Sequence, residues 1–453
     1  MVRTSLAQPR SIPATVIRDT REHCEHRRFV RVGFAVAALA AYAALIVVAS
    51  RWGEALLAQG TRLQIMTPPL NGELDWRPGR TVIPAAAVAL LVLMVIPRWL
   101  ARWRWTTVLA VAFVGAVAWA VALALVDGSG ALTEPLLSGQ YLRSVAQVGD
   151  LGTFLRTFTH RISDYNIHTQ GHPPGMVVVL WLMDSVGLGG VAWNSVLVFA
   201  GGGASVIAVL VGVREVAGEA VARRAMPFVV LAPAAVAWTS GDPFFAGVSA
   251  WAVTALILAT GRTGRRCDAW AVMGGVLFAV TAFLSYGLVL LAIVPVAIGI
   301  WRREYRPLLI AAVVAAFAML TVWIGTGFAW WDGLTATRAR YFAGAGGRRP
   351  YDYFLVGNLA AFAIAVGPAT AVALTRLRRQ PLAVLVGAVL VVVLLADVSG
   401  MSKAEVERIW LPFVPWVMAA CAVLATRPLN TRAWLALQGV GALVLAVAIR
   451  SPW

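Results

Sequence analysis

The amino-acid sequence predicts an all-α fold, a polytopic bundle of transmembrane helices. Its 453 residues are 60% hydrophobic and 13% charged, with a mean hydropathy of +0.78, which is outside the range of soluble domains. Apolar runs of roughly 17 to 25 residues, the length that crosses ~30 Å of hydrocarbon, recur from Phe34 to Ala448 between short arginine-rich segments. No stretch is left for a soluble domain.

About thirteen of these runs are expected to cross the membrane completely. They are 32–50, 81–97, 106–126, 190–212, 226–240, 244–260, 268–286, 287–301, 308–328, 353–374, 382–397, 409–426 and 433–449. The segment 173–187 is short for a span and contains Asp184. If it crossed fully, the arginines of every later inner loop would move outside, against the positive-inside rule. We therefore expect a re-entrant or half-length helix here, with Trp453 outside.

This topology divides the chain into a cytoplasmic tail, residues 1–31, and a single transmembrane domain, residues 32–453. The tail has several arginines and no long apolar core, so it does not resemble a cleavable signal peptide. Two long loops, 51–80 and 127–172, are expected on the outer face. They and the later outer loops carry most of the acidic residues and three of the five histidines, so the chemistry is expected there.

The net charge of +17 does not indicate nucleic-acid binding. The basic residues are scattered between the apolar runs, whereas a polyanion-binding domain gathers them on one folded surface. They are better explained as a topology signal. The three cysteines, Cys24, Cys267 and Cys421, form no CxxC motif, and neither a disulfide framework nor redox chemistry is expected.

The first outer loop contains a compact group of charges. It reads Asn-Gly-Glu73-Leu-Asp75-Trp-Arg77-Pro just before the second span. Two carboxylates and an arginine are thereby placed at the depth where a lipid phosphate lies. A solvated turn is the plainer interpretation for any one of them.

The second outer loop ends in a histidine motif, His168-Thr-Gln-Gly-His172-Pro-Pro-Gly. Two histidines four apart can hold a metal on one helix face, but Gly171 and the two prolines disfavour a continuous helix here. No third ligand accompanies them. Hydrogen bonding to a phosphate or a sugar is the favoured role, and a plain loop is the alternative. Earlier in this loop, apolar residues at helical spacing from Leu151 to Ile162 suggest one or two amphipathic helices lying on the membrane surface.

Shorter outer stretches add further polar residues. Asp242 lies between two predicted spans, Tyr286 follows a break in a helix pair, and basic and aromatic residues alternate from Arg338 to Tyr353. The stretch from Asp397 to Pro412 carries several ionisable residues into an apolar helix, which is costly unless they have partners or a function. Its charged residues after Asp397 are Lys403, Glu405, Glu407 and Arg408. Internal ion pairs, Lys403 with Glu407 and Glu405 with Arg408, are the structural alternative.

These stretches resemble the GT-C superfamily of membrane glycosyltransferases, which transfer sugars from polyprenyl-phosphate donors on the extracytoplasmic face. The matching segments are His168 to Gly175, Leu284-Ser-Tyr286-Gly, and Ser399 to Phe413. Over its whole length the chain is similar to a group of actinobacterial integral membrane proteins within that superfamily. The His-Pro-Pro segment is similar to the Lys/His-Pro-Pro segment of protein O-mannosyltransferases and lipid A aminoarabinose transferases. Those families carry adjacent acids in the first outer loop, where this chain has Glu73-Leu-Asp75, and they have two fewer spans before this segment.

The resemblance implies a transferase in a bacterial cell membrane, with its active site on the extracytoplasmic face. The partners would be a polyprenyl-phosphate sugar donor, with mannose or arabinofuranose as candidate sugars, and a glycan, lipid or protein acceptor. Such a donor already has a good leaving group, so the chemistry needs a carboxylate to take the acceptor proton and cations to hold the phosphate. No cofactor is required, although a divalent cation is compatible with this chemistry.

The expected catalytic base is Asp75, with Glu73 and Asp242 as alternatives. The expected substrate contacts are Arg77, His168, His172, Tyr286, Lys403, Glu405 and Arg408.

Other functions stay open at this point. An intramembrane Asp184 beside a re-entrant segment also suits a transporter or a lipid flippase. An acyltransferase or a non-catalytic envelope assembly protein is a further alternative. The outer acids and histidines lie at the membrane boundary rather than at its midplane, which favours the glycosyltransferase hypothesis.

Overall fold

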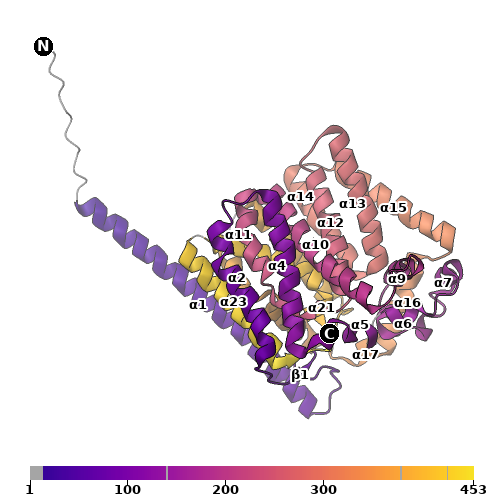
Figure 1. The fold of residues 1–453 in the computed structure, drawn as a ribbon. Helices are drawn as coiled ribbons and strands as arrows, with labels where there is room; N and C mark the ends of the chain where they lie inside the picture. Colours follow the sequence, from indigo (N-terminus) through magenta and orange to yellow (C-terminus); the bar gives the residue numbers. More distant parts are fainter. Residues whose placement is uncertain (1–13, 139–140, 378–379, 426, 453) are drawn as a thin grey trace.

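The chain forms a bundle of helices with almost no β-structure (Figure 1). The structure is a computed structural model that describes residues 14–138, 141–377, 380–425 and 427–452; the start of the expected tail lies outside these ranges. Within the described ranges, the two short strands β1 (Glu73–Leu74) and β2 (Ile449–Arg450) form one antiparallel pair, in which Glu73 faces Arg450. The predicted all-α membrane class is confirmed.

Nine helical segments of the described chain are long and apolar enough to cross a membrane. They are Val32–Ala58 of α1 (Ala14–Ala58), Arg80–Trp99 (η1, α2 and α3), Trp105–Asp127 (α4 and η2), α10 (Val191–Ala217), Asp242–Thr260 (α12, Asp242–Ala259), α13 (Gly264–Leu284), α15 (Arg306–Thr326), α20 (Pro381–Val398) and α23 (Pro428–Ala448). A tenth is obtained if α18 (Tyr351–Val366) and α19 (Pro368–Arg376), bent by 94° at Gly367, count as one broken span.

The nine or ten candidate spans compare with about thirteen expected crossings, and the difference lies in apolar runs that are not continuous helices. Several apolar runs are interrupted: 226–240 divides into α11 (Glu219–Val230) and η5 (Pro233–Ala237), and 287–301 into η6 (Gly287–Ala292) and α14 (Ile293–Arg302). The run 409–426 is a chain of short pieces, α21 (Val406–Ile409), η7 (Leu411–Phe413), α22 (Val414–Met418) and η8 (Ala419–Val423). Prolines in or beside these pieces remove backbone donors, which hydropathy alone does not register.

The half-length helix is present as α9 (Gly175–Ser185), which at 1.5 Å per residue is roughly 17 Å long. Contacts at the opposite end agree with a segment that does not cross. The Arg223 guanidinium on α11 donates to the Leu100 carbonyl at 2.5 Å. The segment just before α4 therefore meets the segment just after α10. Both loops were expected on the cytoplasmic face, and the α9 segment lies between them in sequence.

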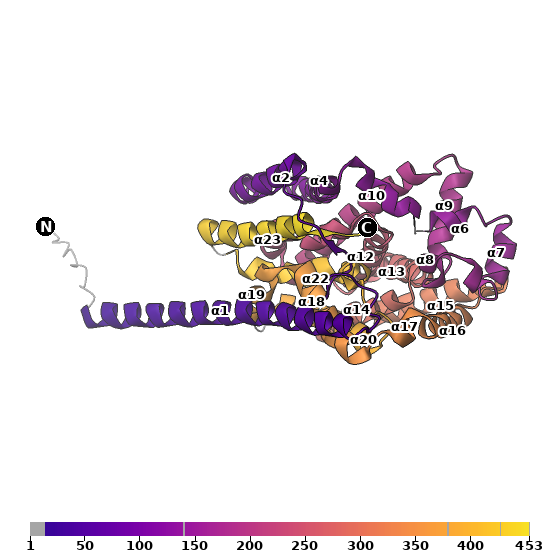
Figure 2. The ribbon, with the colours of Figure 1, turned by 90° about the horizontal axis from the view of Figure 1, so that it is seen from below.

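The two outer loops differ from their expected outlines. Helix α1 continues to Ala58, where Arg51 and Glu54 form an exposed ion pair one turn apart, so the first loop starts later than residue 51. The second loop is built of short helices: η3 (Ser129–Leu132), α5 (Glu134–Ser138), α6 (Leu142–Val145), α7 (Leu151–Thr157), η4 (Ile162–Asp164) and α8 (Ile167–Gln170). Of the one or two helices expected from Leu151 to Ile162, α7 ends at Thr157 and η4 begins at Ile162. These pieces lie with α16 (Trp330–Ala343) and α17 (Ala345–Arg348) at the end of the bundle away from the N-terminus (Figure 2).

Close helix approaches fix the orientation of the motif that follows the histidines. Gly175, the first residue of α9, lies against the backbone of Phe283 on α13, and a Cβ at this position would clash with that carbonyl group. Because a main chain cannot move aside as a side chain can, this contact limits position 175 to glycine. It sets α9, and the prolines before it, at a fixed distance from α13.

We expect Gly175→Ala to destabilise the fold by about 1–3 kcal/mol, the usual cost of overpacking. The matched control is Gly287→Ala, because the space around Gly287 is open. Thermal unfolding in detergent, followed by reaction of the buried Cys421 with a thiol-specific dye, measures both variants. Equal melting temperatures for the two variants would contradict this contact.

Candidate functional site

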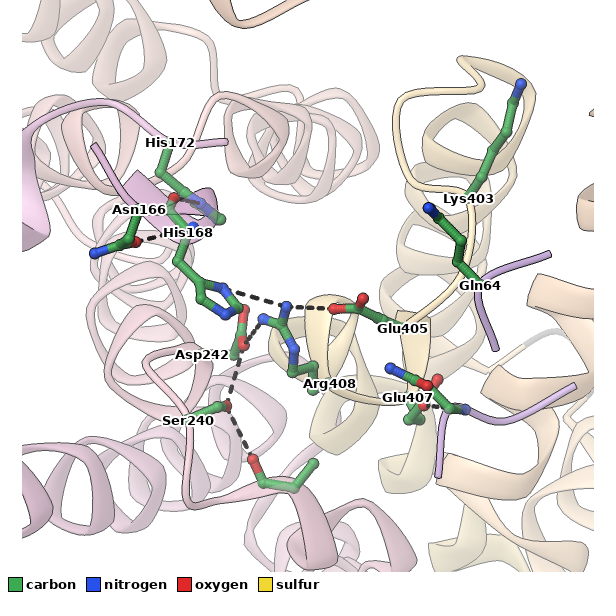
Figure 3. Close-up of polar contacts among 12 residues, drawn as sticks. Gln64, Asn166, His168, His172, Ser240, Asp242, Lys403, Glu405, Glu407 and Arg408 are labelled. Atoms are coloured by element: carbon green, nitrogen blue, oxygen red, sulfur yellow. Dashed lines mark hydrogen bonds and ion pairs between the residues drawn. The ribbon is translucent and has the colours of Figure 1, made fainter. Parts of the chain in front are cut away.

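Three polar side chains meet around the buried guanidinium of Arg408, and the four residues come from three distant segments (Figure 3). Arg408 Nη1 donates to Asp242 Oδ2 at 2.7 Å, and Nη2 donates to Glu405 Oε2 at 2.6 Å. The same Nη2 lies 3.5 Å from His168 Nδ1. We call Asp242, Arg408, Glu405 and His168 the Arg408 cluster.

Asp242 owes its position to the start of a helix. Asp242 is the first residue of α12, and Pro243 follows it. The fixed φ of proline suits the first turn of a helix, and the helix dipole stabilises a carboxylate at its N-terminus. The Ser240 hydroxyl donates to Asp242 Oδ2 at 3.1 Å. With only 3% of the residue exposed, Asp242 depends on Arg408 to balance its charge.

The backbone before Arg408 is held in an unusual conformation. Ala404 and Glu405 have φ angles of 72° and 61°, in the left-handed region that non-glycine residues rarely adopt. This turn ends the non-helical segment and starts α21 at Val406. It brings Glu405 back onto Arg408 three residues later. Strain of this kind is often found at functional sites.

The two histidines are held by a network inside the second loop. The Asn166 side chain caps α8, accepting from the backbone N–H groups of His168 and Thr169 at 3.0 Å each. His172 Nδ1 donates to the His168 carbonyl at 2.8 Å, and the edges of both rings approach Tyr141. No continuous helix joins them, as the Gly171 and proline pattern predicted.

Both histidines are neutral at pH 7. Burial, followed by the positive charge of Arg408, lowers the pKa of His168 to about 2, and burial also lowers the pKa of His172. Because His168 Nδ1 faces the Arg408 donor, its proton is on Nε2, which can donate a hydrogen bond to a ligand.

The Arg408 cluster carries an excess negative charge. Burial lowers the pKa of Arg408, but Asp242 and then Glu405 outweigh burial and raise it, so the guanidinium stays charged. One cation and two carboxylates leave about one unpaired negative charge beside neutral histidines. The cluster therefore suits a proton acceptor better than a phosphate. Within the described ranges no three His, Cys, Asp or Glu residues are placed to hold a metal, and both carboxylates of the cluster are bound to Arg408.

A second group of charges lies next to the cluster and has the opposite sign. Lys403 Nζ donates to the carbonyls of Gly346 and Arg349 at 2.8 and 3.0 Å, and Arg349 donates to the carbonyls of Leu63 and Lys403. Among the residues that the structure describes, neither cation has a carboxylate within ion-pair distance. Burial and the charge of Arg349 lower the pKa of Lys403. Three exposed arginines of α16 and α17 complete what we call the basic patch: Arg338, Arg340, Arg348, Arg349 and Lys403.

The candidates from the first outer loop, Glu73, Asp75 and Arg77, are not part of the Arg408 cluster. Strand β1 pairs with β2, and Asp75 is 3.3 Å from Arg450 and 3.7 Å from Arg77. Arg77 also forms an ion pair with Asp127 and donates to the Ala446 carbonyl at 3.0 Å. Glu73 is exposed beside them. The three predicted residues are thus joined to the C-terminal strand, a partner that local sequence does not reveal.

The structure also places Tyr286 and the two ion pairs that were expected in the segment 403–408. Tyr286 packs edge-on against Trp330, with ring centroids 5.2 Å apart, and is not part of the Arg408 cluster. The structure joins Glu405 to Arg408 but not Lys403 to Glu407, because the backbone before Val406 is not helical.

Several functional side chains were missed by sequence reasoning. Ser240, Asn166 and Tyr141 have no distinctive spacing, and Arg349 was one basic residue among several in its stretch. Glu407 was noted only as an ion-pair partner of Lys403. One of its carboxyl oxygens, Oε1, accepts from the Asn71 backbone N–H at 2.9 Å; for the other, Oε2, the described structure offers no hydrogen-bond partner.

Fold and site together define a multi-pass membrane protein with a buried charged centre at one end of its helices. No family model and no curated protein matches the chain. Its fold is similar to the crystal structure of the Archaeoglobus fulgidus oligosaccharyltransferase in complex with Zn and sulfate, with a TM-score of 0.45 and 13% identity over 82% of this chain. It is also similar to ArnT from Cupriavidus metallidurans in the apo state, with a TM-score of 0.39 and 17% identity over 63% of this chain. The chain spans about half of each protein, 54% in both cases.

Glu407 generates a stability prediction. Burial raises its pKa to about 7, from an ordinary value of 4.5. Between these two pH values the Glu407 carboxyl is protonated in the folded chain but ionised in the unfolded chain. The free energy of unfolding therefore falls as pH rises through this range, and the decrease is complete above pH 7. At 1.36 kcal/mol per pKa unit, Glu407→Gln should be more stable than the parent at pH 8 by about 1–3 kcal/mol and equal to it near pH 4.5.

Melting temperatures at pH 5 and pH 8 measure this effect. The matched control is Asp352→Asn, which removes an exposed carboxylate from α18. If the parent and Glu407→Gln lose stability in parallel between the two pH values, Glu407 is not protonated in the folded chain.

Proposed function

We propose that this chain transfers a sugar from a polyprenyl-phosphate donor to a hydroxyl-bearing glycan, lipid or protein of the cell envelope, on the outer face of the membrane. The observation that carries the proposal is the division of charge along residues 403–408. Cations without carboxylate partners lie at one end of this segment, and the carboxylates of the Arg408 cluster lie at the other.

The basic patch supports binding of the donor phosphate. Lys403 and Arg349 satisfy their donors with backbone carbonyls, so their full charges are available to an anion. Arg340 and Arg348 add exposed charges on the same face. Trp331 of α16 is 69% exposed, as aromatic residues at the membrane interface often are. A lipid phosphate at the membrane surface would meet the exposed arginines directly, whereas the buried Lys403 and Arg349 would act on it through their charge.

The Arg408 cluster supports the proton transfer. Glu405 keeps 24% of its side chain exposed, whereas Asp242 keeps 4%, so Glu405 is the carboxylate that an acceptor can reach. The acceptor oxygen bonds to the anomeric carbon while the bond from that carbon to the phosphate oxygen breaks. The electron pair leaves with the phosphate, and Glu405 takes the hydroxyl proton. Asp242 acts as a positioning residue through Arg408, and His168 Nε2–H can orient the sugar.

The alternatives receive less support. Asp75 and Glu73, the bases first expected, lie beside Arg450 on the short sheet, which favours a structural role. Asp184 is exposed at the C-terminal end of α9 and has no place in the buried Arg408 cluster, so the argument for a transporter or flippase is weaker.

Glu405→Gln should reduce sugar transfer by about 10² to 10⁴, the range typical of general-base removal. Donor binding and melting temperature should stay near parental values, because glutamine keeps the size of the side chain and the basic patch is unchanged. Transfer is measured in membranes with radiolabelled polyprenyl-phosphate mannose or arabinofuranose. Glu54→Gln, an exposed carboxylate of α1, is the matched control. Parental transfer rates in Glu405→Gln and Asp242→Asn would remove the Arg408 cluster from the mechanism.

The double variant Arg340→Gln/Arg348→Gln should weaken binding of a fluorescent polyprenyl phosphate in nanodiscs. At about 1 kcal/mol per basic residue near a membrane surface, the expected loss is roughly 30-fold and should shrink as salt screens the charges. The control is Arg224→Gln/Arg265→Gln, which removes two exposed arginines from loops expected on the opposite face. Equal losses in both double variants would show a general charge effect and contradict a phosphate site at the basic patch.

A further inference from the structure

A small hollow lies beside α21, and Glu407 is part of its wall. It opens between the first loop, η5, α18 and the C-terminal strand. Its lining residues are Leu70, Asn71, Ala234, Val236, Ile364, Ala365, Glu407, Leu445, Ile449 and Ser451. A second hollow, which contains Asp127 and Thr239, shares Val236, Ile449 and Ser451 with it. The walls of the first hollow are mostly apolar, and Glu407 is the single ionisable group among the described residues that line it.

Glu407 faces this hollow with one oxygen unused. The residue is 8% exposed, Oε1 is held by the Asn71 N–H, and Oε2 is the oxygen that lacks a hydrogen-bond partner among the described residues. A buried polar atom left without a partner costs about 1–3 kcal/mol. The unused oxygen therefore favours an occupant that can form a hydrogen bond with it.

The chemistry of the walls selects the class of occupant. Among the described residues that line the hollow there is no cation, so an anion would find no partner there. A hydrocarbon would leave Oε2 unpaired. An uncharged group with a hydroxyl satisfies both conditions. The hollow has room for a hydroxyl or hydroxymethyl arm rather than for a whole sugar ring.

We infer that this hollow is a recognition subsite for one hydroxyl arm of the acceptor sugar, held by Glu407. The inference rests on the proposed function, which it makes more specific. Arg408 and Glu407 are neighbours on α21, with Arg408 against Asp242 and Glu407 against Asn71. A sugar bound at Glu407 would therefore extend toward Glu405, the proposed base. Glu407 is then a specificity residue that contacts the acceptor and takes no part in proton transfer.

A double-mutant cycle between protein and ligand tests this contact. The probes are octyl glycosides of glucose, mannose, galactose and arabinofuranose, together with their single-deoxy analogues, bound to the chain in nanodiscs. For the glycoside that binds best, removing one particular hydroxyl should weaken binding to the parent about tenfold, the loss expected for ~1.4 kcal/mol. In Glu407→Leu the deoxy probe and its parent glycoside should bind equally, because the partner of that hydroxyl is gone.

A control variant and a second variant in the hollow show whether the loss of hydroxyl recognition is specific to Glu407. Asp352→Asn on α18 should preserve the tenfold difference. Val236→Phe, which places a larger side chain in the hollow at a half-buried position, should abolish binding of the glycoside without unfolding the chain. If every deoxy probe shows the same loss in the parent and in Glu407→Leu, or if no glycoside binds, the hollow holds water alone and the inference is overturned.

Binding of fluorescent polyprenyl phosphate to the same preparations separates the two proposals. Normal phosphate binding with no glycoside recognition overturns the subsite and leaves the proposed function standing. Loss of phosphate recognition by the parent itself, at every salt concentration, overturns the proposed function.

Discussion

The interaction on which the site depends is the buried pairing of Arg408 with two carboxylates. A guanidinium that is 4% exposed cannot remain charged without anions, and Asp242 and Glu405 provide them from α12 and from the turn before α21. Removing Arg408 would leave Asp242 as an uncompensated buried charge, which is far more costly than losing a surface ion pair. The pairing therefore fixes how α8, α12 and α21 meet, and the positions of His168 and Ser240 follow from it.

The strained turn at Ala404 and Glu405 separates two electrostatic environments over a very short distance. Before the turn, Lys403 and Arg349 are surrounded by carbonyl oxygens, and after it the carboxylates surround Arg408. A helical backbone would have joined Lys403 to Glu407 and cancelled these charges locally. The left-handed φ angles thus keep a region of positive potential and a proton acceptor apart, yet within reach of one ligand.

How much of this could be predicted from sequence follows from the range of the interactions involved. Apolar run length and the positive-inside rule identified the membrane class and the short α9, because both depend on local composition. His168, His172, Asp242, Glu405 and Arg408 were singled out because charged groups at span ends need partners. The pairing of Glu405 with Arg408 was expected from their spacing. The contacts of Arg408 with Asp242 and His168 could not be inferred, nor could the attachment of Asp75 to Arg450, since each joins segments far apart in the chain. The interruptions within several apolar runs were missed because prolines break helices without lowering hydropathy.

The contact between Asn71 and Glu407 links positions 336 residues apart, and this has a consequence for biosynthesis. During membrane insertion, α12 and its Asp242 enter the bilayer boundary long before Arg408 is translated. Until then that carboxylate has no guanidinium to neutralise it, and the first loop has no Glu407 to receive its backbone donor. The nascent chain must therefore tolerate an incomplete, polar interior or keep it hydrated. Chains that stop short of α21 would expose this defect, which gives membrane quality-control proteases a chemical feature that distinguishes unfinished molecules from finished ones.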